Sequence, residues 1–453
     1  MASGDRRVAV IGGGIAGLAA AHSLAVDGIA ATVFEASPRL GGKVLTTPFA
    51  GHAAIDEGPD AFLARVPWGT ALAERVGLSE QLVSPSAGKA AVYWHRLHDI
   101  PQGLLLGMPT DVMALARSRL ISWPGKLRAA TEPLRRRTAT DVDSLGGYVR
   151  ARFGAEVHVR LVDPLVGSIY AADTDYFSLA AVPQIADLAA KHRSVLIAGR
   201  SMPAPAAHAG PVFYAPKGGM GDLVDRVARE AARMGAVIRT EHPVQRLERV
   251  SHEGWRVDDE AFDAVVLALP APAASRLLQG VAVDAAQSLA SIPTADVAMV
   301  TLAVPSSSWP QHLGSLSGYL VPKPQQRLVT AVSFGSQKWQ HWSVPGSVLL
   351  RVSLGRDGLP VLHLSDEQLL AAAVDEVGHH LGVDLQPTDW RVTRWPGAFP
   401  QYRPHHASLV AHVESRLPPD LVLAGASYHG IGLPACIHSA QRAAAAVGRH
   451  EPA

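Results

Sequence analysis

The chain has 453 residues, 48% of them hydrophobic, which is enough for two or three hydrophobic cores. Its formal net charge is +1, so the composition gives no reason to expect a nucleic acid or another polyanion as partner. The single cysteine, Cys436, excludes an intrachain disulfide and any metal site built from several cysteines, as is usual in a cytosolic protein.

The first predicted elements lie in residues 8–26, which carry no charge and are long enough to raise the question of a membrane span. Four glycines early in this stretch argue against a span. They separate a short apolar run, typical of a buried strand, from a segment rich in alanine, typical of a helix that packs closely on a sheet. We therefore predict a strand, a glycine turn and a helix.

The glycine turn matches the pattern G-x-G-x-x-G at Gly12, Gly14 and Gly17. In this pattern the first glycine makes a tight turn, the second lets a pyrophosphate approach the backbone, and the third allows the helix to pack on the strand. The next predicted strand leads into Glu35, about twenty residues on, where a carboxylate can bind ribose hydroxyls. The alternative is a glycine-rich packing turn. With strand, helix and acid all in register, we predict a dinucleotide-binding turn.

The remaining elements alternate between helical and strand-rich segments. Residues 110–210 are predicted to be mostly helical. Residues 215–250 predict a turn, a helix and a strand, and residues 262–270 predict another strand. Alternating apolar segments between about 295 and 395 predict a second sheet, and a last buried strand at 421–426 precedes a glycine turn and a helix.

Five further motifs occur in order along the whole chain: EGPDAF (57–62), PLVGSIYAAD (164–173), KGGMGDL (217–223), RWPGAFPQY (394–402) and GASYHGIGLPACI (425–437). Together with GGGIAGLAAA, FEAS and LGGK near the N-terminus, they resemble the oxygen-dependent protoporphyrinogen and coproporphyrinogen III oxidases of the FAD-dependent amine oxidase superfamily. The sequence is most similar to the soluble bacterial type that acts on coproporphyrinogen III. Each motif is weak alone, but five in order are specific.

Three positions depart from the pattern of that family. Ala435 stands where the family usually has an acid, and Ser168 where it often has glycine. Ser353 stands where some bacterial members place a tyrosine near the substrate, so the resemblance does not fix the substrate contact at this strand.

The resemblance implies that the cofactor is FAD. In the family, the first glycine turn holds the pyrophosphate, Glu35 binds the ribose, and Lys43 ends a second glycine turn. Loop 58–61 passes by the isoalloxazine, Val244 closes the mid-chain strand and contacts the adenine end, Trp395 lies against the flavin, and residues 431–433 line its pyrimidine side. The implied FAD-binding residues are Gly12, Gly13, Gly14, Ile15, Ala16, Gly17, Glu35, Ala36, Lys43, Gly58, Pro59, Asp60, Ala61, Val244, Trp395, Ile431, Gly432 and Leu433.

Substrate contacts are assigned to three candidates. The resemblance places Ile169 over the flavin, where it would pack on the macrocycle. Arg65 suits pairing with a propionate carboxylate, and an ordinary surface arginine is the equal alternative. Ser353 is the third candidate. No side chain is assigned as catalytic, because atom N5 of the flavin carries out the chemistry.

The implied fold is α/β, with a Rossmann-like FAD-binding domain, an inserted strand-rich substrate domain and a helical domain. The FAD-binding domain is predicted at 1–80, 212–290 and 395–453. The substrate-binding domain is predicted at 81–110 and 291–394, and the helical domain at 111–211.

The implied function is the oxidation of coproporphyrinogen III to coproporphyrin III, with dioxygen as acceptor and hydrogen peroxide as product, in haem biosynthesis. The first alternative is a protoporphyrinogen IX oxidase. A flavin amine oxidase or carotenoid desaturase relative is more distant, and a flavoprotein that only delivers porphyrin to a partner is a non-enzymatic alternative.

The expected partners are the porphyrinogen and dioxygen, with no nucleic acid and no metal. We expect a cytoplasmic protein without a transmembrane segment. A brief hand-off of product to a ferrochelatase and a transient contact with a membrane surface are left open.

Overall fold

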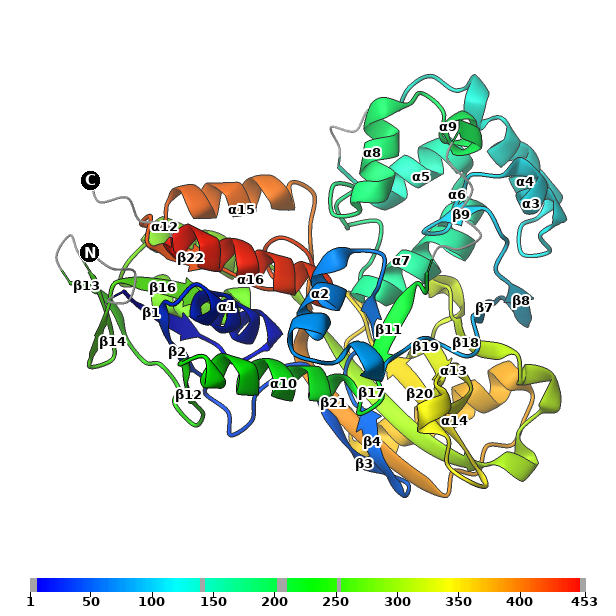
Figure 1. Ribbon diagram of the computed structural model, residues 1–453. Helices are drawn as coiled ribbons and strands as arrows, with labels where there is room; N and C mark the ends of the chain where they lie inside the picture. Colours follow the sequence, from blue (N-terminus) through cyan, green and yellow to red (C-terminus); the bar gives the residue numbers. More distant parts are fainter. Residues whose placement is uncertain (1–5, 139–142, 202–209, 251–253, 449–453) are drawn as a thin grey trace.

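The computed structural model describes residues 6–138, 143–201, 210–250 and 254–448. Its first part is a parallel sheet in the order β12–β2–β1–β16–β22 (Figure 1). The strands are β1 (Arg7–Ile11), β2 (Ala30–Phe34), β12 (Val237–Arg239), β16 (Ala264–Leu267) and β22 (Leu421–Leu423). The three inner strands, β2, β1 and β16, are almost completely buried, as parallel strands covered on both faces must be. Three distant stretches of the chain thus build one sheet.

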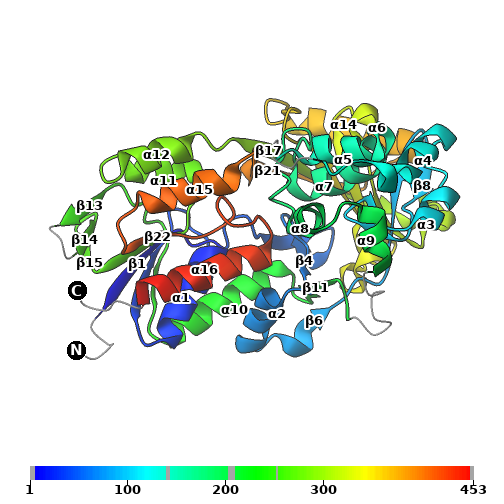
Figure 2. The same cartoon turned by 90° about the horizontal axis from the view of Figure 1, so that it is seen from above.

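Helices cover one face of this sheet, and a small antiparallel sheet with two more helices covers the other. Figure 2 shows α1 (Ile15–Val26), α10 (Met220–Arg233) and α16 (Leu433–Gly448) side by side, and α1 packs on both of the others. The alanines of α1 are buried, and their small side chains allow this close packing. The other face packs on β13 (Leu247–Val250), β14 (Gly254–Val257), β15 (Glu260–Phe262), α11 (Ala271–Leu278) and α12 (Val283–Ala290).

The second part is a seven-stranded sheet in the order β21–β17–β20–β19–β18–β7–β8. Its long strands are β17 (Thr294–Pro305), β20 (Ser347–Leu354) and β21 (Asp389–Pro400), all antiparallel to their neighbours. The others are β18 (Leu316–Leu320), β19 (Val329–Phe334), β7 (Lys89–Tyr93) and β8 (Leu97–Asp99), and α14 (Asp366–Leu381) packs on one face. The other face contacts the hairpin of β3 (Thr46–Phe49) and β4 (His52–Asp56), where Arg391 on β21 donates to the hydroxyl of Thr47.

The third part is helical and lies above the second sheet in Figure 1. It comprises α3 (Val112–Arg117), α4 (Trp123–Ala130), α5 (Leu145–Phe153), α6 (Ala155–Val157), a π-helical turn (His158–Val162), α7 (Asp163–Tyr170), α8 (Pro183–Lys191) and α9 (Val195–Ser201). The remaining helices and strands are β5 (Phe62–Leu63), α2 (Pro67–Arg75), β6 (Leu82–Val83), β9 (Leu104–Leu105), β10 (Met108–Pro109), β11 (Phe213–Pro216), α13 (Gly335–Lys338) and α15 (His406–Ser415). Helix α15 packs on α12 in the first part.

The uncharged stretch 8–26 folds as strand β1, a glycine turn and helix α1. Among the described residues, no helix is long and apolar enough to cross a membrane. The α/β fold class is confirmed. The boundaries of the three predicted domains stay a prediction.

The structure corrects the placement of Val244. Val244 does not close the mid-chain strand, because β12 ends at Arg239 and the next strand, β13, begins at Leu247. Glu241 has a positive φ of 56°, which a β-strand does not accommodate. Val244 therefore lies in the connection that follows this break, partly buried against the core around Trp255.

Candidate active site

The first glycine turn needs two of its glycines for its own geometry. Gly12 has a φ of 109°, and a Cβ there would lie 2.5 Å from the carbonyl oxygen of Ala268. A Cβ at Gly17 would lie 1.8 Å from the carbonyl oxygen of Gly12. Both positions therefore require glycine for the strand and the helix to pack, whatever binds there.

Gly14 differs from these two because its missing side chain leaves open space. A Cβ built at Gly14 would come no closer than 4.0 Å to its nearest neighbour, the Cα of Gly42 in the second glycine turn. Gly14 is also the N-cap of α1, and no side chain caps this helix. The free N–H groups of the helix start, near Ile15 and Ala16, carry the positive end of the helix dipole. This space between two glycine turns suits a phosphate group.

Glu35 lies directly after β2, at the carboxyl end of the sheet. One carboxylate oxygen accepts a hydrogen bond from the backbone N–H of Gly13 at 2.7 Å, and the other accepts from the N–H of Ser37 at 2.8 Å. These bonds orient the carboxylate and leave lone pairs for a hydroxyl donor. Ala36 beside it is exposed.

Loop 57–61 rests on one face of the seven-stranded sheet. Trp395 on β21 donates its indole N–H to the carbonyl of Glu57 at 3.0 Å, and Thr393 on the same strand donates to the Glu57 carboxylate at 2.5 Å. Arg351 on β20 donates to the carbonyl of Gly58. A Cβ at Gly58 would lie 2.2 Å from the carbonyl oxygen of Lys43, so the second glycine turn also packs tightly against this loop.

Asp60 is a partly buried carboxylate, 16% exposed, with three donors around it. Lys338 donates to it at 2.8 Å and the indole of Trp339 at 3.0 Å, and Arg351 lies 3.4 Å away. Burial alone would raise the pKa of Asp60, but Lys338 and Arg351 outweigh burial and hold this pKa below its usual range. Asp60 therefore anchors its loop as a permanent anion, and its neighbours Pro59 and Ala61 stay partly exposed.

The ammonium group of Lys43 lies near β21 and near Cys436 of α16. Its Nζ donates to the carbonyl of Gly397 at 3.1 Å, and it has no carboxylate partner among the described residues. Burial lowers the pKa of Lys43. Burial also raises the pKa of Cys436 to about 12, so this thiol stays protonated. An anionic group bound here would complete the charge balance of Lys43.

The last glycine loop, Ile431–Leu433, leads into α16. The hydroxyl of Tyr402 accepts a hydrogen bond from the N–H of Gly430 at 2.8 Å and donates to the carbonyl of Ala426 at 2.6 Å. Ile431 packs against the core of the helical part. The loop is thus held between the first sheet and the helical part, with the start of a long helix behind it.

The substrate candidates lie in different parts of the molecule. Ile169 is in the last turn of α7 and is 50% exposed. Ser353 shares one face of β20 with Arg351, the face that contacts loop 57–61, and its hydroxyl lies 3.7 Å from the sulfur of Met299 on β17. Arg65 is exposed just before α2 and has no hydrogen bond or ion pair with the described residues.

The sequence interpretation missed Lys338, Arg351 and Tyr402. Arg351 left a signal, because it is the one charged residue in the apolar strand SVLLRVSL. A buried arginine in such a strand needs a carboxylate or carbonyl partner from another element. Lys338 and Tyr402 left no comparable local signal, since their partners are far away in the sequence.

Comparison with known proteins decides the family. The profile of flavin-containing amine oxidoreductases matches residues 15–448. The chain belongs to this family. It is 37% identical to the coproporphyrinogen III oxidase of Mycobacterium leprae (strain TN), over 97% of each chain. It is 28% identical to the protoporphyrinogen oxidase of Homo sapiens, over 99% of each chain.

A solved structure supports the same relationship. A crystal structure from Exiguobacterium sp. 255-15, provisionally named a protoporphyrinogen oxidase, superposes with a TM-score of 0.86 and is 30% identical. The alignment covers 98% of this chain and 99% of the other. The chain is therefore an FAD-dependent oxidoreductase of the porphyrinogen oxidase type within the amine oxidase family.

The residues of this site fit FAD. A dinucleotide with an anionic pyrophosphate requires open space, free N–H groups and a positive charge, and these are present in front of Gly14, at the uncapped start of α1 and at Lys43, which has no carboxylate partner among the described residues. The oriented carboxylate of Glu35 suits the ribose. Among the described residues, no cluster of histidine, cysteine and acidic side chains could hold a metal ion.

Proposed function

We propose that this chain oxidises coproporphyrinogen III to coproporphyrin III, with dioxygen as electron acceptor and hydrogen peroxide as second product. The similarity to the Mycobacterium leprae coproporphyrinogen III oxidase over nearly the whole of both chains carries this proposal. Protoporphyrinogen IX is the second candidate substrate, supported by the more distant human relative.

A porphyrinogen becomes a porphyrin by losing six electrons and six hydrogens, and three molecules of dioxygen become three of hydrogen peroxide. Bound FAD supplies the two-electron chemistry of each cycle. The protein has to bind the macrocycle, orient it and exclude water.

Different residues of this chain bind the cofactor and the macrocycle. The turn from Gly12 to Gly17 binds the pyrophosphate, and Glu35 binds the ribose. The N–H groups of loop 431–433, at the start of α16, and the ammonium of Lys43 stabilise negative charge on the cofactor. Ile169 packs on the macrocycle and Arg65 pairs with a propionate, while Ser353 and Met299 line the sheet side.

We further propose that FAD is bound without a covalent link. The thiol of Cys436 is buried and protonated, so it is a poor nucleophile. Acid precipitation of the purified protein is expected to release FAD into the supernatant, about one per chain. Yellow colour that stays in the pellet, or FMN or NAD in the extract, would contradict this assignment.

We also propose that the protein is located in the cytoplasm and that it hands its product to a ferrochelatase. Fractionation of cells that express the protein from its own promoter tests the first point. Co-purification with the ferrochelatase of the same cells, with and without coproporphyrin III, tests the second.

The proposed reaction is tested by oxygen uptake and porphyrin fluorescence with the purified FAD-loaded protein. We expect both signals on adding coproporphyrinogen III, with three molecules of dioxygen consumed for each porphyrin formed. Binding of porphyrin without oxygen uptake would instead indicate a carrier. Oxidation of primary amines but not of porphyrinogens would indicate an amine oxidase.

A further inference from the structure

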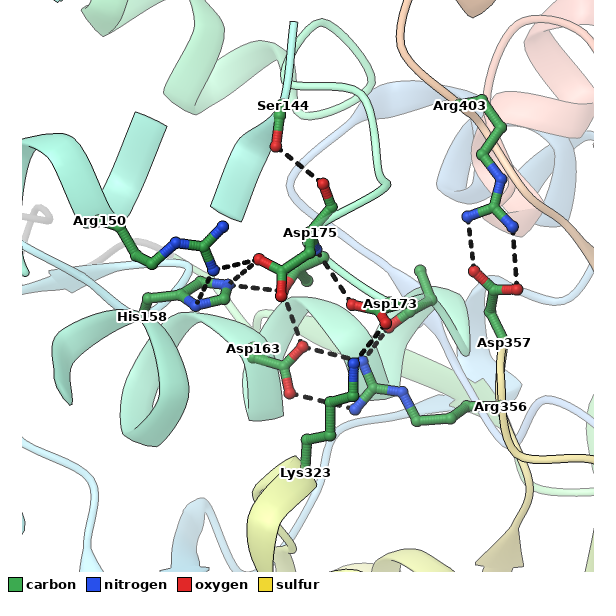
Figure 3. Close-up of polar contacts among 12 residues, drawn as sticks. Ser144, Arg150, His158, Asp163, Asp173, Asp175, Lys323, Arg356, Asp357 and Arg403 are labelled. Atoms are coloured by element: carbon green, nitrogen blue, oxygen red, sulfur yellow. Dashed lines mark hydrogen bonds and ion pairs between the residues drawn. The ribbon is translucent and has the colours of Figure 1, made fainter. Parts of the chain in front are cut away.

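The segment after α7 is held by contacts from two sides (Figure 3). Helix α7 ends in the left-handed residue Ala171, whose φ is 46°. The carbonyl of Ala171 accepts a hydrogen bond from the N–H of Asp357 at 2.8 Å, in the turn after β20. The last turn of α7, with Ile169, is therefore connected directly to the seven-stranded sheet.

One buried ion pair joins the start of α7 to its end. Arg356, in the same turn after β20, binds both carboxylate oxygens of Asp163, at 2.8 and 3.1 Å. The same guanidinium donates to the carbonyl of Ala172. Asp163 is the first residue of α7 and Ala172 lies just beyond its last, so this one group contacts both ends of the helix. The two side chains are only 4% and 3% exposed.

The helix and the guanidinium fit each other closely. A Cβ at Gly167, in the middle of α7, would lie 2.7 Å from Nη2 of Arg356. Arg356 thus lies along a face of α7 on which glycine leaves room for it. On the other side, the hydroxyl of Thr174 donates to Asp163 at 2.7 Å and lies 2.8 Å from Nε2 of His158. Burial would raise the pKa of Asp163, but Arg356 outweighs it and keeps this carboxyl ionised.

The end of α7 also contacts the last glycine loop through a row of aromatic rings. Tyr170 stacks on Phe177, with ring centroids 5.0 Å apart, and Phe177 stacks on Tyr402 at 6.2 Å. Tyr402 accepts the hydrogen bond from Gly430 that holds this loop. The end of α7, which carries Ile169, is therefore held by the turn after β20 and by this row of aromatic rings, which leads to loop 431–433.

We propose that Asp163 and Arg356 are positioning residues that fix the end of α7, and with it Ile169, over the porphyrinogen. This inference rests on the proposed function, because it takes Ile169 as a substrate contact. The pair touches no reacting atom. It acts by keeping the half-exposed side chain of Ile169 in one place against the macrocycle.

The test uses Asp163→Asn, which keeps the size of the side chain and removes its charge. Hydrogen exchange of the peptide spanning 164–172 is expected to become faster, because the carboxylate that orders Arg356 is lost. FAD content is expected to stay at the wild-type level. KM for coproporphyrinogen III is expected to rise about tenfold with a smaller change in kcat, since ground-state placement of the macrocycle is what the variant loses. If Asp163→Asn does not fold, Arg356→Lys is measured in the same way.

Glu132→Gln provides a matched control. Glu132 forms an equally buried ion pair with Arg152, at 0% and 1% exposure, in the same helical part. Neither side chain of this pair makes a hydrogen bond or ion pair with residues 170–175, all of which lie in the described part of the chain. We expect this variant to lose thermal stability and keep the wild-type KM and the wild-type exchange of 164–172.

Two results would overturn the inference. Unchanged exchange of 164–172 in the Asp163 or Arg356 variant would do so whatever the substrate is. An unchanged KM alongside faster exchange would reduce the pair to a structural role. Failure of the wild-type protein to oxidise any porphyrinogen would instead refute the proposed function, and the exchange measurement would still decide whether the pair fixes α7.

Discussion

Replacing Gly14 with valine is predicted to weaken FAD binding by roughly a hundredfold or more while leaving the apoprotein folded. A Cβ at this position meets nothing closer than the Cα of Gly42 at 4.0 Å, and the φ of Gly14 is −70°, which valine adopts without strain. The cost to the apoprotein is the weaker N-cap propensity of valine, about 1 kcal/mol. The side chain would, however, occupy the space from which we expect the pyrophosphate to approach the start of α1.

The size of the binding defect follows from the hydrogen bonds that are lost. Two N–H groups at the start of α1 that bind a charged phosphate contribute about 1.5 to 3 kcal/mol each. Their loss corresponds to roughly a hundredfold to ten-thousandfold weaker FAD binding. The assay is titration of the apoprotein with FAD, followed by flavin fluorescence quenching, with circular dichroism and thermal melting as the folding check.

Gly17→Val is the contrasting variant. Its Cβ would lie 1.8 Å from the carbonyl oxygen of Gly12, so α1 and β1 cannot both keep their places and the apoprotein itself should fail to fold. A folded Gly14→Val protein with the wild-type affinity for FAD would refute the assignment of the pyrophosphate site. A normally stable Gly17→Val protein would refute the packing argument for the turn.

Three further predictions concern charge and shape around the site. Burial raises the pKa of Asp56 from 3.8 to about 6. The folded state therefore holds a proton that the unfolded chain releases, and the free energy of unfolding should fall by roughly 3 kcal/mol as the pH rises from about 4 to 6. Asp56→Asn should lack this decrease in urea titrations, and equal slopes for variant and wild type would contradict the prediction. Ile169→Asp should keep its flavin and lose turnover because it places a charge against the macrocycle, and unchanged activity would remove Ile169 from the site. Arg65→Ala should lower kcat/KM for coproporphyrinogen III by a factor roughly 5 to 150 times larger than for protoporphyrinogen IX, which lacks two of the propionates; this factor corresponds to about 1 to 3 kcal/mol of transition-state binding. Equal losses would make Arg65 an ordinary surface residue.

The parts of the site that sequence could predict are those whose determinants are local. The turn from Gly12 to Gly17 and the acid after β2 lie within one strand–helix–strand unit, so spacing alone indicates how they meet. The second, strand-rich sheet also has a local signal, because its alternating apolar segments reflect one buried and one polar face.

The contacts that could not be predicted join residues distant in sequence. Asp60 meets Lys338 and Arg351 only because β20 and α13 fold against loop 57–61. Asp163 and Arg356 likewise come from a helix and a sheet turn that are far apart in the chain. The misplacement of Val244 has a different cause. The strand ends before Glu241, which has a left-handed backbone conformation. Because this residue is not a glycine, the sequence gives no sign of a turn there.

The central claim is most directly tested by measuring kcat/KM for coproporphyrinogen III and protoporphyrinogen IX with the purified, FAD-loaded protein under identical conditions. Porphyrin fluorescence reports product, and an oxygen electrode reports the acceptor. The two substrates share the reacting core and differ only at the rim, so the ratio isolates recognition of the additional propionates. We predict a clear preference for coproporphyrinogen III, with hydrogen peroxide formed at three molecules for each porphyrin. A clear preference for protoporphyrinogen IX would contradict the proposed substrate, and turnover of neither porphyrinogen would contradict the proposed function itself.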